Sequence, residues 1–380
     1  GEQAPGISLT PDEKAEIALA LDEANVEFVE AGSACTGPGE RETIARVAEL
    51  GLDARVTSFA RGVENDIDLA IECGVDGINL VVPASDRHVE DKVDSTREAV
   101  VTETVELVEY AKEHGLWVEV LGEDGSRADL AFLTELMGAA IDAGADRICA
   151  PDTVGHATPD RTLAVVSRLV DLGPTSTHTH DDLGLAMTNV LVSVAAGADL
   201  VHGTINGIGE RAGNASLEEI VMAIETRKND FNLHTNVNTR EIYPTSQLLT
   251  EVTGRSVQPN KAIVGENAFA HEAGIHQHGV LKNPMTYEIM TPQSVGLDSN
   301  KIVLGKHSGR YALKERVKEL NFDLDKEQLE QVYQAFTNMA DSNKAIRENE
   351  LIDLVNNTLS EIENNGESPS KRTANSDIQQ

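Results

Sequence analysis

The stretch from residue 55 to residue 82, RVTSFARGVENDIDLAIECGVDGINLVV, contains the unit that decides the fold. Two short runs rich in β-branched and apolar residues, Arg55–Phe59 and Ile78–Val82, stand on either side of a segment with the apolar spacing of an amphipathic helix. A strand, a helix and a second strand in this order predict two parallel strands of one sheet.

The same alternation recurs over the first 205 residues. Runs of this kind lie at Val26–Val29, Arg55–Phe59, Ile78–Val82, Trp117–Leu121, Arg147–Ala150, Thr175–His180 and Leu200–Ile205. Capping signals mark two of the intervening helices: Thr10 precedes Pro11 and has Glu13 three positions on, and Thr158 precedes Pro159. The chain is therefore predicted to be an α/β protein with seven parallel strands.

A closed barrel of this type needs eight strands, so the sequence predicts a (β/α)8 TIM barrel whose first strand is missing from the chain. We expect that strand to precede Gly1. The barrel is expected over residues 1–230, a smaller helical subdomain over 231–362, and a disordered tail over 363–380. Helical spacing in the subdomain is clearest at Ser246–Thr253, Arg310–Leu320 and Lys326–Met339.

Acidic residues greatly outnumber basic ones, 64 against 31, which gives a formal charge of −33. Because no basic block compensates, nucleic acid and anionic membranes are excluded as partners. The charge predicts adaptation to a halophile's cytoplasm, where salt screens self-repulsion; an ordinary acidic protein is the alternative. No apolar run is long enough to span a bilayer, and the three scattered cysteines predict small buried thiols rather than a disulfide framework.

Candidate chemistry lies where the predicted strands end. His178 and His180 stand two apart, so both rings leave one face of a strand and can share one metal ion. Asn214 closes a glycine-rich loop after the next strand and can reach the same ion. Glu123 ends an earlier strand, where it can either handle protons or complement a helix dipole with its neighbour Asp124. A lone pair of histidines is more often incidental, but active sites of this fold lie at the carboxyl ends of its strands.

Several ordered motifs resemble the acyl-CoA-condensing synthases of the metallolyase-type barrels, which comprise isopropylmalate, citramalate and homocitrate synthases. The resemblance runs from Gly1 to roughly Val355. The motifs that carry it are Gly1–Gln3, Glu30–Gly32, Ser58–Arg61, Pro151–Gly155, His178–Asp182, Asn206–Asn214, Gly274–Gln277 and Gly305–Arg310.

This resemblance implies acetyl-CoA and a 2-oxo acid as substrates and a divalent ion, manganese, magnesium or zinc, as cofactor. His178 and His180 would be metal ligands, with Asn214 near the same ion. Residues around the oxo acid would be Gln3, His88, Glu123, Thr153 and Thr204, with Glu123 as a catalytic group. His276 and Tyr287 would be catalytic in the active site of a partner subunit, which implies a homodimer.

Within the family, Pro151–Gly155 and Tyr287–Pro292 look most like the isopropylmalate synthases, whose oxo acid is 2-oxoisovalerate and whose product leads to leucine. Pyruvate, as in citramalate synthases, and 2-oxoglutarate, as in homocitrate synthases, are alternatives, since pocket size separates such substrates weakly.

The sequence departs from the family pattern in several places. The family's first strand ends in an Arg-Asp pair before Gly-Glu-Gln, and its Asp is a metal ligand; we expect this pair upstream of Gly1. Leu121 replaces a small polar residue, His278 an acidic one and Asp182 an Asn. A catalytically inactive barrel that acts as a binding subunit is therefore a second hypothesis. Longer members carry a leucine-binding regulatory domain, so we expect this chain to be insensitive to leucine.

Overall fold

The computed structural model describes residues 1–271, 286, 288–298, 301–302, 308–342, 346 and 348–366. The chain divides into two compact units. The first consists of Gly1–Ala268 with Gln293–Leu297, and the second of Phe269–Pro292 with Asp298–Gln380.

A seven-stranded parallel sheet forms the centre of the first unit, in the order in which its strands occur along the chain. The strands are β1 Phe28–Ser33, β2 Arg55–Arg61, β3 Gly77–Pro83, β4 Trp117–Glu123, β5 Arg147–Cys149, β6 Thr175–Thr177 and β7 Leu200–Val201. This confirms the predicted number of strands and their parallel direction. Because β1 pairs with β2 and β7 with β6, β1 and β7 are the two edges of the sheet.

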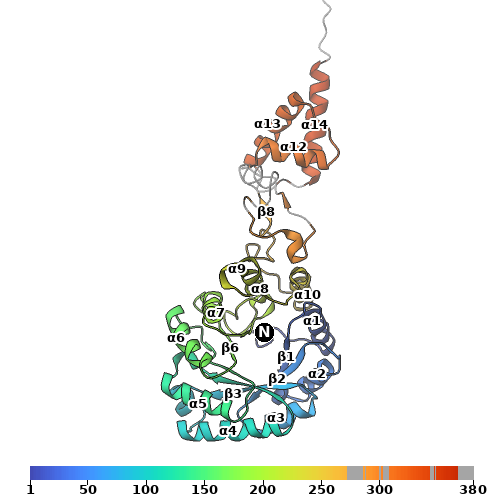
Figure 1. Ribbon diagram of the computed structural model, residues 1–380. Helices are drawn as coiled ribbons and strands as arrows, with labels where there is room; N and C mark the ends of the chain where they lie inside the picture. Colours follow the sequence, from blue (N-terminus) through green and yellow to red (C-terminus); the bar gives the residue numbers. More distant parts are fainter. Residues whose placement is uncertain are drawn as a thin grey trace, which may run out of the picture. The chain divides into compact units, whose positions relative to one another are not determined.

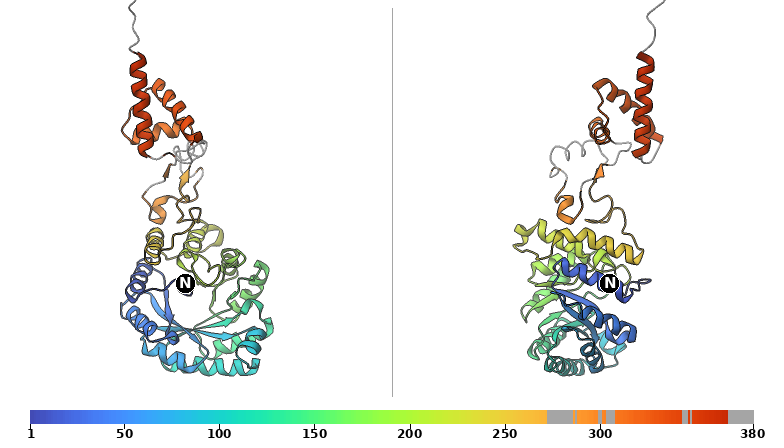
Figure 2. Two further views of the ribbon diagram at one scale, coloured as in Figure 1. Left: turned by 180° about the vertical axis from the view of Figure 1, so that it is seen from behind. Right: turned by 90° about the vertical axis from the view of Figure 1, so that its right-hand side faces the viewer.

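Helices follow the strands and lie outside the curled sheet as an arc (Figure 1), which is also visible from behind (Figure 2). They are α1 Pro11–Glu23, α2 Pro38–Ala48, α3 Glu64–Glu72, α4 Arg97–Glu113, α5 Leu130–Asp142, α6 Pro159–Val170, α7 Ala186–Ala195, α8 Leu217–Thr226, α9 Lys228–Phe231 and α10 Ile242–Thr253. Both predicted caps are confirmed: Thr10 and Glu13 form a capping box on α1, and Thr158 caps α6.

The core of this unit lies between the sheet and its helices. Ile78 and Leu80 of β3 and Val118 and Val120 of β4 are fully buried, and they belong to one cluster with Leu133 of α5. Strands buried on both faces read as nearly continuous apolar runs, which is why the sequence located them.

Several predicted strand boundaries are wrong, most clearly those of β1, β6 and β7. β1 begins at Phe28 rather than Val26, because Asn25 takes a left-handed conformation (φ 61°) and pairing with β2 starts at Phe28. β6 ends at Thr177 and β7 at Val201, before the predicted ends. Beyond Thr177 the backbone pairing continues as isolated bridges, among them Asp152 with Thr179 and His180 with Asn214.

The first unit continues past residue 230, where the barrel was expected to end. Helix α10 contacts α1, and the backbone of Asn238 donates a hydrogen bond to Ala24 O. These contacts place the segment with the barrel rather than with the helical part of the chain.

The second unit is mainly helical, as predicted. Its elements are a short parallel pair, β8 Ala270–His271 with β9 Lys301–Ile302, and three helices, α12 Arg310–Glu319, α13 Lys326–Ser342 and α14 Glu348–Gly366. A separate apolar core joins the helices through Leu313, Phe336 and Val355. Helix α14 passes residue 362, where the tail was expected to begin.

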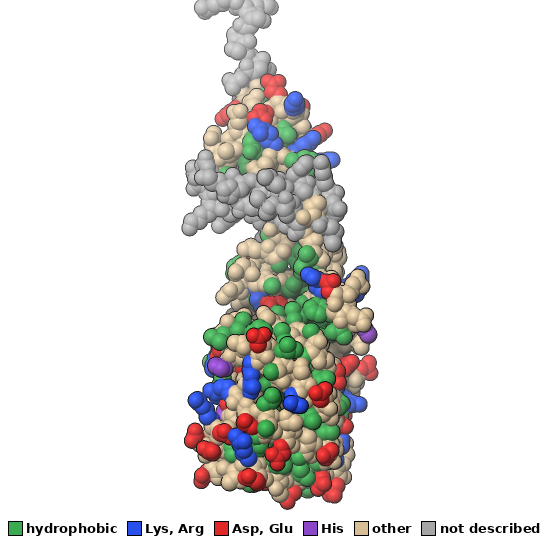
Figure 3. Space-filling model, turned by 60° about the vertical axis from the view of Figure 1, so that its left-hand side comes forward, with side chains coloured by type: hydrophobic (Ala, Val, Ile, Leu, Met, Phe, Trp, Pro, Cys, Tyr) green, Lys and Arg blue, Asp and Glu red, His purple; other side chains and the backbone are tan. Residues whose placement is uncertain are grey.

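Acidic side chains are scattered over the visible face of the larger unit, among basic and hydrophobic ones (Figure 3). Cys73 and Cys149 are buried as expected, whereas Cys35 is half-buried; all three are free thiols. Among the described residues, no helix combines the length and the apolar character needed to cross a membrane.

Candidate active site

The candidate residues gather at the carboxyl edge of the sheet, where parallel strands all end. Glu123 is the last residue of β4, His178 follows β6 directly, and His202 follows β7 directly. Because the strands are parallel and in neighbouring order, loops far apart in the sequence meet at this edge.

His178 and His180 face each other as the spacing predicts. Their Nε2 atoms lie 3.1 Å apart. Burial lowers the pKa of His178 well below its usual value, and the neighbouring His202 and His180 rings lower it further. Burial and then the Arg211 guanidinium lower the pKa of His180. Two neutral imidazoles with converging nitrogens fit a divalent ion, since zinc–nitrogen bonds of about 2.0–2.1 Å span such a separation.

Asn214 reaches this pair from the loop after β7. Its side-chain amide nitrogen lies 3.2 Å from His178 Nε2, and its backbone forms an antiparallel bridge with His180. Glycines make the approach possible: a Cβ on Gly209 would collide with the Asn214 amide, and one on Gly213 (φ 93°) with Gly207 O. The glycine-rich motif is therefore the backbone device that carries Asn214 to the histidines.

The outer side of the pair is held by Arg211. Its guanidinium donates to His180 Nδ1 at 2.9 Å, to Thr153 O at 2.8 Å and to both carboxylate oxygens of Asp182. Hydrogen bonding from Arg211 lowers the pKa of Asp182. Thus the predicted Thr153 and the histidine pair are joined through Arg211, to which the sequence assigned no role.

Glu123 lies beside His88, so the structure brings these two predicted residues together. Oε2 of Glu123 is 3.2 Å from His88 Nδ1. Lys92, from the same single turn of π-helix as His88 (η2, Arg87–Lys92), donates to Glu123 at 2.7 and 2.5 Å. The ammonium group of Lys92 therefore lies directly against the carboxylate at the end of β4.

Asp124 connects Glu123 to the rest of the site. It is fully buried with φ 62°, and its carboxylate accepts from Ser85 Oγ at 2.6 Å and from Arg127 Nε at 2.7 Å. Its backbone N–H donates to Thr153 Oγ1 at 2.8 Å. A continuous series of hydrogen bonds therefore runs from the end of β4 through Thr153 and Arg211 to His180.

The Pro151–Gly155 motif serves this arrangement structurally. The Asp152 carboxylate accepts from Ser126 Oγ at 2.7 Å and from the backbone N–H of Ala157 at 3.1 Å, which closes the turn after β5. Gly155 (φ 59°) passes so close to Asp182 that no side chain would fit. Both features hold Thr153 at the carboxyl edge.

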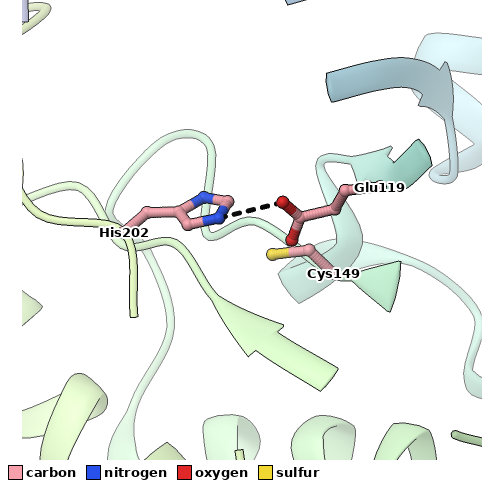
Figure 4. Close-up of side chains that lie close together, drawn as sticks. All are labelled: Glu119, Cys149 and His202. Atoms are coloured by element: carbon pink, nitrogen blue, oxygen red, sulfur yellow. Dashed lines mark hydrogen bonds and ion pairs between the residues drawn. The ribbon is translucent and has the colours of Figure 1, made fainter. Parts of the chain in front are cut away.

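A second group of polar residues adjoins His178 through His202, and Figure 4 shows how His202, Glu119 and Cys149 lie close together. His202 Nδ1 is 3.3 Å from His178 Nδ1, and His202 Nε2 is 3.1 Å from Glu119 Oε2. Ser176 donates to the other oxygen of Glu119. Burial acts to raise the pKa of Glu119, but His202 and Ser176 outweigh burial, so this pKa is lowered. Burial acts to lower the pKa of His202, but the Glu119 carboxylate outweighs burial, so this pKa is raised.

Cys149 of β5 completes this group. Donor atoms of Glu119, Cys149 and His202 all lie within 4.8 Å of one another, the separation expected of residues that could hold a metal ion. Burial raises the pKa of the Cys149 thiol, which favours the protonated form. A protonated thiol is a poor metal ligand.

Other predicted residues are placed less centrally or lie outside the described residues. Gln3 is exposed in the turn before α1. Thr204 donates its hydroxyl to Ile208 O at 2.7 Å, so it closes the loop that carries Asn214. His276 and Tyr287 lie outside the described residues.

Sequence reasoning missed Glu119, His202, Lys92 and Arg211. The sequence could have indicated Glu119, because it is a carboxylate in the middle of an otherwise apolar strand. Burying such a group is costly unless a hydrogen-bonding or charged partner lies next to it. His202 follows a predicted strand in the same way as His178. Lys92 ends the π-helical turn η2 and Arg211 lies in a loop, and at neither position does residue spacing give such a signal.

With this geometry in hand, the comparisons with known proteins decide the family. The HMGL-like family profile matches residues 1–249, and the profile of the homocitrate synthase post-HMGL domain-like family matches residues 263–344. The chain belongs to the HMGL-like family. This confirms the resemblance to the acyl-CoA-condensing synthases and makes the chain an enzyme of that family.

Two relatives come from one organism, Methanocaldococcus jannaschii. Its (R)-citramalate synthase is 45% identical, with 93% of this chain and 72% of the relative covered. Its 2-isopropylmalate synthase is 43% identical, with 95% of this chain and 70% of the relative covered. The relatives are thus divided between two activities at nearly equal identity.

Solved structures of HMG-CoA lyases share the fold. The enzyme of Pseudomonas aeruginosa gives a TM-score of 0.61 at 18% identity, covering 70% of this chain and 93% of its own. That of Brucella melitensis gives 0.59 at 16% identity, covering 67% and 95%. At such identities the likeness concerns the barrel architecture alone, which agrees with the predicted fold class.

Proposed function

We propose that the chain condenses acetyl-CoA with a 2-oxo acid at the carboxyl edge of its sheet. The observation that carries the proposal is the convergence of His178 and His180, 3.1 Å apart at Nε2, beside the Glu123–His88 pair. The family supports it, since acetyl-CoA and 2-oxo acids are the substrates of its synthases.

His178, His180 and Asn214 would hold the divalent ion. Nitrogen and oxygen donors of this kind suit zinc, manganese and magnesium. When bound, the ion supplies Lewis acidity at the ketone of the oxo acid. Arg211 sits where it can bind an anionic group of a substrate, because its guanidinium already bridges Thr153 and Asp182 at the rim.

Glu123 is the candidate base within the described residues. The methyl group of acetyl-CoA must lose a proton before its carbon can attack the ketone. Glu123 can accept that proton, and its carboxylate lies 2.7 Å from Lys92 Nζ and 3.2 Å from His88 Nδ1. His276 is a second candidate for this step, by resemblance to the family.

The reaction balances with one water. A carbon–carbon bond forms between the acetyl methyl carbon and the ketone carbon, and the ketone oxygen ends as a hydroxyl group. Water then cleaves the thioester, which releases CoA and leaves a second carboxylate on the product. This hydrolysis makes the condensation effectively irreversible.

For the oxo acid we propose 2-oxoisovalerate, on the resemblance of Pro151–Gly155 and Tyr287–Pro292. Pyruvate is the second candidate, because the citramalate synthase of Methanocaldococcus jannaschii is slightly more similar to this chain than its 2-isopropylmalate synthase. Leu121 shares a face of β4 with Glu119 and Glu123, and on this basis we propose that its large apolar side chain limits the room for the oxo acid's own side chain.

The test is free-CoA release by the purified chain with acetyl-CoA, each of the three oxo acids and a series of divalent ions. Turnover with 2-oxoisovalerate above pyruvate supports the first candidate, and the reverse order supports the second. Leu121→Ala should raise kcat/KM for 2-oxoisovalerate relative to pyruvate by about tenfold. Metal binding without any turnover would favour the inactive barrel.

We also propose that the active enzyme is a homodimer in which His276 and Tyr287 act in the partner's site. Mixing a His276→Ala chain with a Glu123→Gln chain tests it, because subunits that exchange at random restore intact sites in half of the dimers. Recovery of about a quarter of native activity is expected. No recovery after demonstrated subunit exchange would place both residues in one chain's site.

A further inference from the structure

The residues beneath His178 form an ordered series. His178 Nδ1 meets His202 Nδ1 at 3.3 Å, His202 Nε2 meets Glu119 Oε2 at 3.1 Å, and Ser176 donates to Glu119 Oε1. Three different strands supply them, since Glu119 lies in β4, Ser176 in β6 and His202 just after β7. Glu119 is 1% exposed, so its charge needs these partners.

If His178 binds an ion through Nε2, only one arrangement of protons on the His178 and His202 rings satisfies all the contacts of this series. A neutral imidazole carries one N–H, so a ring that offers Nε2 to a metal carries its proton on Nδ1. His178 then donates to His202 Nδ1. His202 in turn has its proton on Nε2 and donates to the Glu119 carboxylate, which is the contact that the structure shows.

We propose that His202 and Glu119 are positioning residues for the metal ligand His178. They fix the ring orientation and the tautomer that directs Nε2 toward the ion, and the carboxylate makes that nitrogen more basic. Metal-binding histidines commonly donate their second N–H to a carboxylate; here a second imidazole lies between the two. This inference rests on the proposed metal site at His178 and His180.

A competing assignment uses the same atoms, with Glu119, Cys149 and His202 holding an ion of their own. It would require a thiolate at Cys149, a residue that is completely buried, and it would take His202 Nε2 away from Glu119. The hydrogen-bonded series needs neither change.

The experiment measures metal affinity without substrate. His202→Phe removes the acceptor from His178, whereas His202→Asn keeps an acceptor near the position of Nδ1. Apparent dissociation constants for Zn²⁺ and Co²⁺, obtained by competition with a chelating dye, should rise about 10- to 100-fold for His202→Phe. His202→Asn should recover part of that loss, and Glu119→Gln should lie between them. The visible spectrum of the Co²⁺ form should shift in the same order.

Cys149→Ala is the matched control, because Cys149 touches the group without joining the series. It should leave affinity and spectrum unchanged. Two ions in the native chain, one of them lost in Cys149→Ala, would overturn the inference in favour of the separate site.

His178→Ala separates this inference from the proposed function. If His178→Ala removes the ion while folded His202→Phe and Glu119→Gln bind it as the native chain does, the positioning role is wrong and the metal site stands. If His178→Ala binds the ion unchanged, the metal site itself is wrong. Should His202→Phe unfold, Glu119→Gln and His202→Asn decide in its place.

Discussion

The two histidines of the candidate site lie two residues apart, yet their surroundings are opposite. The inner partners of His178 are His202, which contacts it, and Glu119 and Ser176 behind His202; Glu119 is 1% exposed. The outer partners of His180 are Arg211, which contacts it, and Asp182 behind Arg211; their side chains are 42% and 25% exposed. His178 is therefore backed by a hydrogen-bonded series that ends in a carboxylate, whereas His180 is backed by a guanidinium cation.

This difference predicts that the two rings differ in how much their protons must rearrange before they can bind an ion. The proton on His178 Nδ1 can stay where it is when Nε2 binds. His180 Nδ1 instead accepts from Arg211, so its own proton lies on Nε2, between the two rings. If both Nε2 atoms held an ion, it would replace that proton, and His180 would then carry one on Nδ1, where Arg211 could no longer donate. Metal entry would thus cost His180 its Nδ1 contact with Arg211, whereas the Nδ1 contact of His178 with His202 would stay.

The largest expected effect comes from removing both rings. His178→Ala combined with His180→Ala should lower metal affinity by more than about 100-fold, the upper end of the loss expected for His202→Phe. Metal content after dialysis measures this. In the native chain, chelation should abolish CoA release and added divalent ion should restore it.

His234, which is exposed, supplies the control. His234→Ala should bind metal and turn over as the native chain does. Full turnover of a chelated, metal-free native sample would contradict the site as a whole.

The loop that carries Arg211 and Asn214 can be displaced by mutation while the inner partners keep their positions. Gly213→Ala forces a side chain onto Gly207 O at φ 93°, which should cost about 1–3 kcal/mol of stability and displace Asn214. Denaturant unfolding and metal titration check this. Gly138, within α5 with open space around it, is the matched control, since Gly138→Ala should stabilise by about 0.5–1 kcal/mol. Equal effects at the two glycines would show that the loop is not under this constraint.

Arg211→Met and substitution of His202 are expected to change metal affinity in opposite directions. Losing the donor to His180 Nδ1, together with a nearby positive charge, should tighten metal binding several-fold, roughly the worth of one hydrogen bond. Substitution of the inner His202 should weaken it. Arg227→Met removes a guanidinium paired with Asp230 elsewhere on the surface and should change neither. Weaker binding in Arg211→Met would mean that the outer contact supports the metal site.

Salt should give the smallest effect at the site and a broad effect on the molecule. At 1 M salt the screening length is about 3 Å, so the exposed Arg211–Asp182 pair loses strength while the buried Glu119–His202 pair keeps it. The formal charge of −33 is screened too, so the Tm should rise with KCl over the molar range. Thermal unfolding of the native chain at low and high KCl measures this; a flat or falling Tm would count against halophilic adaptation.

The sequence by itself determined the β/α order, the number of strands and the helical second unit. β-branched runs and capped amphipathic stretches are local signals, so Arg55–Phe59 and Ile78–Val82 were visible as strands without any knowledge of their neighbours. The period of two also sufficed to place His178 and His180 on one face, because adjacent residues carry that geometry themselves.

Only the tertiary structure decided what stands behind each ring. Glu119 and His202 are 83 positions apart, and Arg211 is 31 positions from His180. Which side chains meet depends on the order of β4 to β7, on where each ladder ends and on the glycine turns that return Arg211 and Asn214 to the edge. Those are relations between distant strands, and a local pattern does not encode them because it fixes the face of a residue but not its neighbour across the sheet.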